Sequence, residues 1–294
     1  MIRILSTNNL AALIEDWKVN VVNPMISSND TDRLAEFALH LSRILAYPNL
    51  DVNGTLKRLD ELGAELKQSI KKLMPLRPTQ TIEQINNFLF KQKMFKSNVE
   101  DYYNPLNSYL NIVLQEKSGI PITLSIVYMR IGYVLNFKLR PVNFPAHFLV
   151  KYTLEGDNSD IVIDPFNGGR IMDDYALKAL LDQSYPSQNV SLTRAFVEEA
   201  TAGQVMIRML NNLKGSYYEA QDIDRAEIAN EMVIAIDQYN PDAMRDKGMM
   251  LLKRGNLTEA LKTLNLYLEL DPEAEDADAV LDIIRQIRSQ TNQQ

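Results

Sequence analysis

A histidine and an aspartate in the middle of this chain have the residue types and spacing of a catalytic pair. His147 lies in the segment NFPAHFLV (143–150), and Asp164 ends the apolar run IVID (161–164). If the loop between them turns at Glu155 and Gly156, a hairpin makes His147 and Asp164 direct cross-strand neighbours. A carboxylate beside an imidazole orients it as a general base, so the pair indicates acid–base or nucleophilic chemistry.

The thiol that would usually complete such a triad as its nucleophile is missing from this chain. It would stand at the start of the helix that begins at Pro121, where the helix dipole lowers the pKa of a thiol. The chain has no cysteine, and the hydroxyls available there are those of Thr123 and Ser125. The dipole contributes about 1 kcal/mol, under about one pKa unit, whereas a hydroxyl starts several units above a thiol. Catalysis would therefore need His147 as the base and an oxyanion hole that the sequence does not locate.

Simpler structural interpretations compete with a catalytic one. A single histidine on an apolar strand usually packs in a core. Asp164 is followed by PFNGG (165–169) and could instead cap the backbone amides of a turn. His40, the second of the two histidines, lies far away on a helical stripe. Two distant histidines without cysteine form no metal-ligand set, so the sequence predicts neither a metal ion nor a cofactor.

Hydrophobic periodicity predicts the elements that must position these residues. Up to about residue 100 the chain is predicted to be helical, because apolar residues recur at helical spacing in 34–45, 56–70 and 82–89. A helix at 107–115 and another from Pro121 to Leu135 follow, with Gly119 breaking the chain between them. Strands are then expected at 139–144, 147–153 and 161–163, with a polar hairpin loop at 155–160.

The last hundred residues repeat at the 34-residue period of tetratricopeptide repeats. Gln221, Asp222 and Ala226 recur there as Gly255, Asn256 and Ala260. Two repeats seldom stand alone, because each buries its apolar face on a neighbour. A final helix over about 277–287 is therefore expected to cap the array, and the other end is expected to lean on the central domain. Acidic residues at its start would favour a basic partner; they are Glu273, Glu275, Asp276 and Asp278.

Composition limits the classes of function. The chain has 294 residues, 46% of them hydrophobic and 23% charged, which suits a globular protein of two domains. Its net charge of −7 argues against nucleic acid as the main partner, since phosphate binding needs a basic surface. The apolar runs are too short to span a bilayer and the N-terminus has no export signal, so we expect a cytoplasmic protein that does not bind membranes.

Several separated motifs together resemble the bacterial SirB family. They are YYNPLNS (102–108), GIPITL (119–124), NFPAHFLV (143–150) and DPFNGGR (164–170), with YPNLD (47–51) and NNFLF (86–90) upstream. The resemblance implies a transglutaminase-like core, related to the papain-type cysteine-protease fold, and a C-terminal tetratricopeptide segment. It also implies that His147 and Asp164 stand at the family's His and Asp positions. Thr123, or alternatively Ser125, would stand where active relatives carry cysteine.

These observations predict an α+β, mostly helical protein with a transglutaminase-like (papain-type) core. We expect an N-terminal helical region at 1–100, the core at 101–195, and two tetratricopeptide-like repeats with a capping helix at 196–294. The favoured function is a pseudoenzyme, a non-catalytic interaction protein that takes a protein or peptide partner through the repeats and the core cleft. One alternative is a hydrolase or acyltransferase using Thr123 or Ser125, with His147 as base and Asp164 as orienter. A small-molecule sensor is the other.

Overall fold

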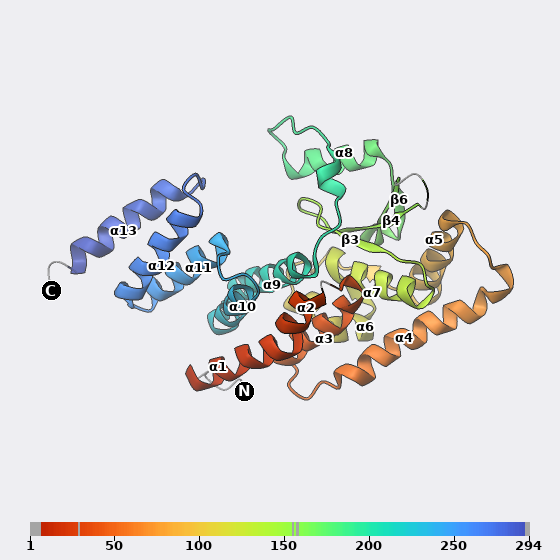
Figure 1. The fold of residues 1–294 in the computed structure, drawn as a ribbon, viewed down its shortest axis with the longest axis horizontal. Helices are drawn as coiled ribbons and strands as arrows, with labels where there is room; N and C mark the ends of the chain where they lie inside the picture. Colours follow the sequence, from red (N-terminus) through yellow and green to blue (C-terminus); the bar gives the residue numbers. More distant parts are fainter. Residues whose placement is uncertain (1–6, 29, 155, 157–158, 292–294) are drawn as a thin grey trace. The chain divides into compact units, whose positions relative to one another are not determined.

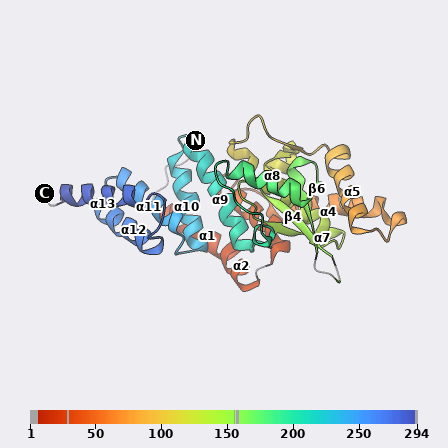
Figure 2. The same cartoon turned by 90° about the horizontal axis from the view of Figure 1, so that it is seen from above.

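Helices form most of this protein, with two small sheets among them (Figure 1; Figure 2). The smaller sheet pairs β1 (Lys96–Ser97) with β2 (Ser118–Gly119) in parallel. The computed structural model describes residues 7–28, 30–154, 156 and 159–291. Residues 19–209 form one compact unit, the core unit. The remaining described residues, from both ends of the chain, form a second, the repeat unit. The expected α+β, mostly helical fold class is confirmed.

The core unit begins with the helices that the apolar stripes predict. Its helices are α2 (Asn23–Ser28), α3 (Leu34–Leu45), α4 (Val52–Ser69), α5 (Pro78–Asn86), α6 (Leu110–Glu116), α7 (Pro121–Val134), α8 (Asp174–Ser184) and the first part of α9 (Ala202–Glu219). α4 starts where the Asp51 carboxylate accepts a hydrogen bond from the Gly54 amide at 2.9 Å, a standard N-cap. α7 is apolar on nearly all sides and is the central helix of the unit, packing on α3, α4 and α5.

A four-stranded antiparallel sheet follows α7, in the order β3-β4-β5-β6. The strands are β3 (Arg140–Val142), β4 (Leu149–Thr153), β5 (Asp160–Asp164) and β6 (Arg170–Met172). α8 covers one face, where Leu177 and Leu181 pack with Val142 and Leu149. α7 packs against β3 and β4, and Figure 1 shows it across the sheet from α8. The sheet therefore lies between two helices, with the β3–β4 connection carrying His147.

The predicted pairing of His147 with Asp164 is wrong by two residues. β4 pairs with β5 so that Val150 lies opposite Ile163, which leaves Asp164 level with Leu149. His147 is not in a strand, because the chain turns at Pro145 and Ala146, and Ala146 has φ of 50°. Of the expected hairpin loop, Glu155, Asp157 and Asn158 lie outside the described residues. The two side chains still meet, but through a turn rather than through a cross-strand pair.

The repeat unit has the helical hairpins that the 34-residue period predicts. Its helices are α1 (Thr7–Trp17), the second part of α9, α10 (Ile223–Ile236), α11 (Pro241–Lys253), α12 (Leu257–Leu270) and α13 (Ala277–Thr291). α10 and α12 begin and end 34 residues apart, as do the ends of α9 and α11. Gly248 allows close packing of α11 on α12, since a Cβ there would lie 2.5 Å from Leu264 Cδ2.

The N-terminal helix completes this unit. α1 packs on α10, and the indole Nε1 of Trp17 donates a hydrogen bond to the Met232 carbonyl at 3.1 Å. Trp17 is fully buried. A segment from the start of the chain thus supplies a helix that the repeats alone would lack, which no local pattern in the sequence indicates.

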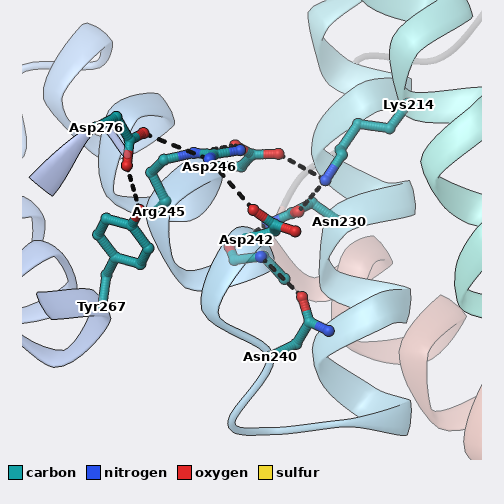
Figure 3. Close-up of polar contacts among 9 residues, drawn as sticks. Lys214, Asn230, Asn240, Asp242, Arg245, Asp246, Tyr267 and Asp276 are labelled. Atoms are coloured by element: carbon teal, nitrogen blue, oxygen red, sulfur yellow. Dashed lines mark hydrogen bonds and ion pairs between the residues drawn. The ribbon is translucent and has the colours of Figure 1, made fainter. Parts of the chain in front are cut away.

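Polar contacts connect successive helices of the repeats (Figure 3). Lys214 of α9 is buried and pairs with Asp246 of α11 at 2.6 Å, while its Nζ donates to Asn230 Oδ1 at 3.1 Å. Arg245 of α11 pairs with Asp276 at 3.4 Å, and the Tyr267 hydroxyl donates to the same carboxylate. Asp276, which was expected to favour a basic partner, is therefore engaged inside the unit.

Candidate functional site

His147 and Asp164 form a hydrogen-bonded pair in the core unit. The His147 Nε2 atom lies 2.9 Å from Asp164 Oδ1, and the two residues are 8% and 2% exposed. A carboxylate accepts but does not donate, so Nε2 carries the proton in this contact. No hydrogen bond to Nδ1 is present within the described part of the chain. The geometry is that of a base held by its orienting carboxylate.

Asp164 also fixes the turn that follows it. It is the N-cap of the 3-10 turn η6 (Pro165–Asn167): its Oδ1 accepts from the Phe166 amide at 3.1 Å and the Asn167 amide at 3.2 Å. Its Oδ2 accepts from the Asn167 side chain at 2.7 Å. Burial alone would raise the pKa of Asp164, but the hydrogen bonds from His147 and Asn167 outweigh it and hold that pKa below its ordinary value. The capping role considered as a simpler interpretation and the orienting role are thus combined in one carboxylate.

The segment before His147 is held from both sides. The Phe144 carbonyl accepts hydrogen bonds from the His147 amide at 3.1 Å and from Arg208 Nη1 at 2.8 Å. The Ser184 hydroxyl of α8 donates to the Pro145 carbonyl at 3.0 Å. These contacts fix the left-handed turn at Ala146 and therefore the position of the imidazole.

The Thr123 hydroxyl belongs to the start of α7. It accepts from the Ile120 amide at 3.1 Å and donates to the Asn107 carbonyl at 2.9 Å, and the residue is 0% exposed. The first contact is the reciprocal half of a capping box, which satisfies one of the free amides of the first helical turn. Thr123 and His147 share no hydrogen bond within the described residues.

Ser125 likewise forms no hydrogen bond with His147 or Asp164 in the described structure. It is 0% exposed, and its Oγ has no hydrogen-bond partner in the described structure. It stands two residues after Thr123 and so points from a different side of α7. The structure brings His147 and Asp164 together, and it brings neither Thr123 nor Ser125 into hydrogen-bonding contact with them.

Aromatic residues from two other motifs form a series of ring contacts that begins at the imidazole. The Phe166 ring meets His147 edge-to-face at 5.9 Å, and Tyr102 meets Phe166 at 6.3 Å. Tyr102 in turn packs on Tyr103 at 5.4 Å, and Tyr103 is 71% exposed. The ring contact of His147 is thus with Phe166, while Phe144 and Phe148 are buried. The separated motifs YYNP, NFPAHF and DPFNGG converge on one face of the core unit.

The upstream motif NNFLF supports the same face through Asn86. Its side-chain nitrogen donates to the Gly169 carbonyl at 2.8 Å, and its Oδ1 accepts from the Tyr128 hydroxyl at 2.8 Å. Gly169 has φ of +75°, and a Cβ on it would lie 1.8 Å from Asn86 Oδ1. The turn after Asp164 is therefore locked against α5.

Arg208 is a residue of this face that the sequence did not indicate. It lies 61 positions after His147, in a helix that continues into the repeats, and its guanidinium lies 5.7 Å from the Phe148 ring centre. Nη1 donates to Asn143 Oδ1 as well as to the Phe144 carbonyl. Long-range contacts of this kind leave no periodicity or spacing signal in one sequence.

Other potential sites lie apart from the pair. Among the described residues no group of three or more His, Asp or Glu side chains could hold a metal ion. A cavity of about 520 Å³ is lined by residues that include Lys96, Asn104, Asn107 and Ile112, but by neither His147 nor Asp164. None of the helices in the described ranges is long and apolar enough to cross a membrane.

Comparison with known families agrees with this architecture. Residues 53–211 match the family model described as Transglutaminase-like superfamily, and residues 213–285 match the model described as Tetratricopeptide repeat. The first match spans more than half of the chain. The chain therefore belongs to the transglutaminase-like superfamily.

Relatives of similar length carry the name UPF0162 protein. One from Xylella fastidiosa (strain 9a5c) is 31% identical over 274 residues, covering 91% of this chain and 95% of the relative. UPF0162 protein YchA of Escherichia coli (strain K12) is 26% identical over 240 residues, covering 81% and 84%. The human F-box only protein 21 is 36% identical over 141 residues, which is 46% of this chain and 21% of that protein. No solved structure matches the chain.

The expected transglutaminase-like core and tetratricopeptide segment are thus confirmed, while the family name is UPF0162 in these relatives. Tetratricopeptide repeats stack helix pairs into surfaces that bind proteins and peptides. The combination of the two domains indicates an interaction module.

Proposed function

We propose that this protein is a non-catalytic interaction protein, in which the His147–Asp164 face of the core unit binds a protein or peptide partner. The observation that carries the proposal is the position of Thr123. Its hydroxyl is fully buried and is engaged on both sides in capping α7, with the Asn107 carbonyl and the Ile120 amide. A hydroxyl that donates to a carbonyl cannot at the same time give its proton to an imidazole.

The chemistry of the chain supports the same proposal. It has no cysteine, and Ser125 is fully buried in the core unit without a hydrogen bond to His147. Burial in apolar surroundings raises the pKa of a hydroxyl further, because it disfavours the charged form. The repeats would add a second surface for the partner, and the net charge of −7 favours a protein over nucleic acid. A cytoplasmic location and membership of the SirB family are part of the proposal.

A hydrolase or acyltransferase is the second candidate, and one observation favours it. The base-and-orienter half of a triad is intact, with Nε2 of His147 at 2.9 Å from Asp164 and Nδ1 free of hydrogen bonds within the described chain. His147 would then take a proton from a substrate or a water molecule rather than from a protein hydroxyl.

Turnover of acyl substrates separates the two candidates. The intact protein is incubated with a panel of aryl esters, alkyl thioesters and glutamine amides, beside the variants His147→Ala and Thr123→Cys. An interaction protein gives the same background rate in all three, including Thr123→Cys, because the new thiol would face the Asn107 carbonyl. Turnover that is present in the intact protein and absent in His147→Ala would establish the hydrolase instead.

A further inference from the structure

The half-buried Arg208 lies next to the His147 turn and lacks the partner that arginines in such positions normally have. Its Nη1 is used for Asn143 Oδ1 and the Phe144 carbonyl, and its guanidinium packs over the Phe148 ring. Both oxygen acceptors are neutral. The Nε–Nη2 edge, which is the side that pairs with a carboxylate through two parallel hydrogen bonds, donates to no residue in the described ranges.

Three other partly buried arginines of this protein are neutralised by carboxylates. Arg130 pairs with Asp60 at 2.6 Å, Arg140 with Asp32 at 3.1 Å, and Arg245 with Asp246 at 3.1 Å. Arg208 forms no ion pair with any described residue, although acidic side chains outnumber basic ones in the chain, 38 to 31. Burial without an anion lowers the pKa of Arg208. A desolvated cation that is left uncompensated is unfavourable by itself and favourable for an anionic ligand.

The surroundings of Arg208 suit a peptide. Tyr102 is close enough for the charge of Arg208 to act on its hydroxyl, although burial dominates and raises the pKa of Tyr102. Tyr102, Tyr103 and Leu106 are exposed side chains of one short segment, and Tyr102 leads through Phe166 to His147. Tyrosine and arginine are the residues most enriched at the energetic centres of protein interfaces. We call the set Tyr102, Tyr103, Phe166 and Arg208 the Arg208 face.

We propose that the Arg208 face binds an acidic peptide segment of a partner protein, with an Asp or Glu carboxylate paired to the Nε–Nη2 edge of Arg208 and a neighbouring apolar residue packed on Tyr102 and Tyr103. The inference rests on the proposed function, because it names the chemistry of the partner that the core unit would take. It assigns to Arg208 both the recognition of the carboxylate and, through the Phe144 carbonyl, the positioning of the His147 turn.

Two matched peptides test the proposal in the unmodified protein. Acetyl-Leu-Glu-Leu-amide and acetyl-Leu-Gln-Leu-amide differ in one charge and are titrated into the full chain carrying ¹³C-labelled tyrosine, with the Tyr102 and Tyr103 signals identified from Tyr→Phe variants. The Glu peptide is expected to shift both signals and to bind about tenfold more tightly than the Gln peptide, which corresponds to about 1.4 kcal/mol, since a charge-assisted bidentate pair is stronger than a neutral hydrogen bond. Equal binding of the two peptides overturns the proposal.

Variants then identify the residue responsible. Arg208→Lys keeps the charge but loses the two parallel N–H donors of the guanidinium, so the preference for Glu over Gln is expected to fall by about tenfold. Arg77→Lys changes an exposed arginine at the start of α5 and is expected to leave the preference unchanged. An unaltered preference in Arg208→Lys overturns the assignment. So does displacement of the Glu peptide by sodium acetate at equal concentration, which would indicate a site for small anions only.

The result of the peptide comparison is independent of the result of the turnover assay. If acyl turnover that depends on His147 were found, the proposed non-catalytic function would fail, while the Glu-to-Gln comparison would still decide whether Arg208 recognises a carboxylate. Conversely, equal binding of both peptides removes the acidic partner and leaves the question of catalysis to the turnover assay.

Discussion

Asp164 has three tasks that single-residue changes can separate: it caps η6, orients His147 and carries a buried negative charge. Its oxygens accept four hydrogen bonds, from His147, from the Phe166 and Asn167 amides and from the Asn167 side chain. Each of these bonds favours the ionised form. The charge of one buried carboxylate therefore stabilises both the turn and the orientation of the imidazole.

The lowered pKa of Asp164 predicts a specific loss of stability in acid. Its folded-state pKa lies below the ordinary value of 3.8, so its contribution is fully present above about pH 4 and is lost as the pH falls through the folded pKa. We expect the free energy of unfolding to decline less steeply between about pH 5 and pH 3 in Asp164→Asn than in the natural protein. Urea denaturation at a series of pH values measures this. The exposed Asp278→Asn should keep the natural slope, and an identical slope in Asp164→Asn would contradict the expectation.

Thr123 gives a prediction about stability rather than about rate. Thr123→Val keeps the shape and removes the hydroxyl, which leaves the buried Ile120 amide and Asn107 carbonyl without this partner. We expect a loss of about 2 kcal/mol in the free energy of unfolding, against about 1 kcal/mol or less for Thr123→Ser, which retains the hydroxyl. Chemical denaturation of the two variants in parallel provides the comparison. Equal losses would mean that the methyl group, and not the cap, is what matters.

For single residues, the sequence predicts which side chains come together, but it does not predict the backbone geometry that brings them together. His147 and Asp164 were identified from their types, and they do form a pair. The predicted pairing was wrong because β4 and β5 pair with Val150 opposite Ile163, a shift of two residues. In addition, Ala146 adopts a left-handed turn that keeps His147 out of the strand, a conformation that a non-glycine residue rarely adopts and that single-sequence patterns do not reveal. Arg208 was missed because its contacts with Asn143 and Phe144 span more than 60 positions.

Among the elements, the turn from Asp164 to Gly169 has little freedom to change. Gly168 and Gly169 both have left-handed φ values, +71° and +75°. A Cβ on Gly168 would meet nothing within 4 Å, whereas a Cβ on Gly169 would overlap the Asn86 side chain. An alanine at position 168 would therefore meet backbone strain alone, whereas an alanine at position 169 would meet the same strain and a steric clash.

Paired alanine substitutions test this difference. Gly168→Ala is expected to cost about 1 kcal/mol, the usual penalty for a left-handed alanine. Gly169→Ala must in addition displace Asn86 from its bonds to Gly169 and Tyr128, and we expect a loss of about 3 kcal/mol or more. Thermal or urea denaturation of both variants gives the two values. If they differed by less than about 1 kcal/mol, the contact with Asn86 would be less rigid than the structure shows.

The buried ion pair of the repeats is the corresponding feature of the second unit (Figure 3). Lys214→Met removes the cation that Asp246 and Asn230 share, and we expect a loss of about 3 kcal/mol because polar groups are left buried without their partner. Arg285→Gln breaks the exposed pair with Asp282 and should cost less than about 0.5 kcal/mol. Denaturation curves followed by circular dichroism compare the two. A small effect of Lys214→Met would show that Arg245 compensates Asp246.

Helices were the most predictable elements, for a physical reason. The stripe at 34–45 coincides with α3, and Pro121 starts α7, since helical periodicity and proline placement are local signals. The 34-residue offset of α10 and α12 follows from the repeat. β6 and α8 were not predicted, because short half-exposed segments carry little periodicity.

Across the whole molecule, the two units are not consecutive stretches of sequence. The repeat unit combines residues after 209 with the first helix of the chain, α1, while the core unit takes the residues between them. Expectations based on continuous segments could not anticipate this, since the contact of Trp17 with Met232 joins residues 215 positions apart. Deletion of α1 is therefore expected to act on the repeats, although it removes the other end of the chain.

Trp17 is the one tryptophan of the sequence, and it is buried against α10. Its fluorescence is consequently a built-in signal from the repeat unit, while the 13 tyrosines and the helical circular dichroism signal report on both units. In one denaturation experiment, a shift of the tryptophan emission to longer wavelength would mark exposure of the α1–α10 interface. The same sample would thus show, without any added label, which of the two units a ligand, a substitution or a change of pH acts upon.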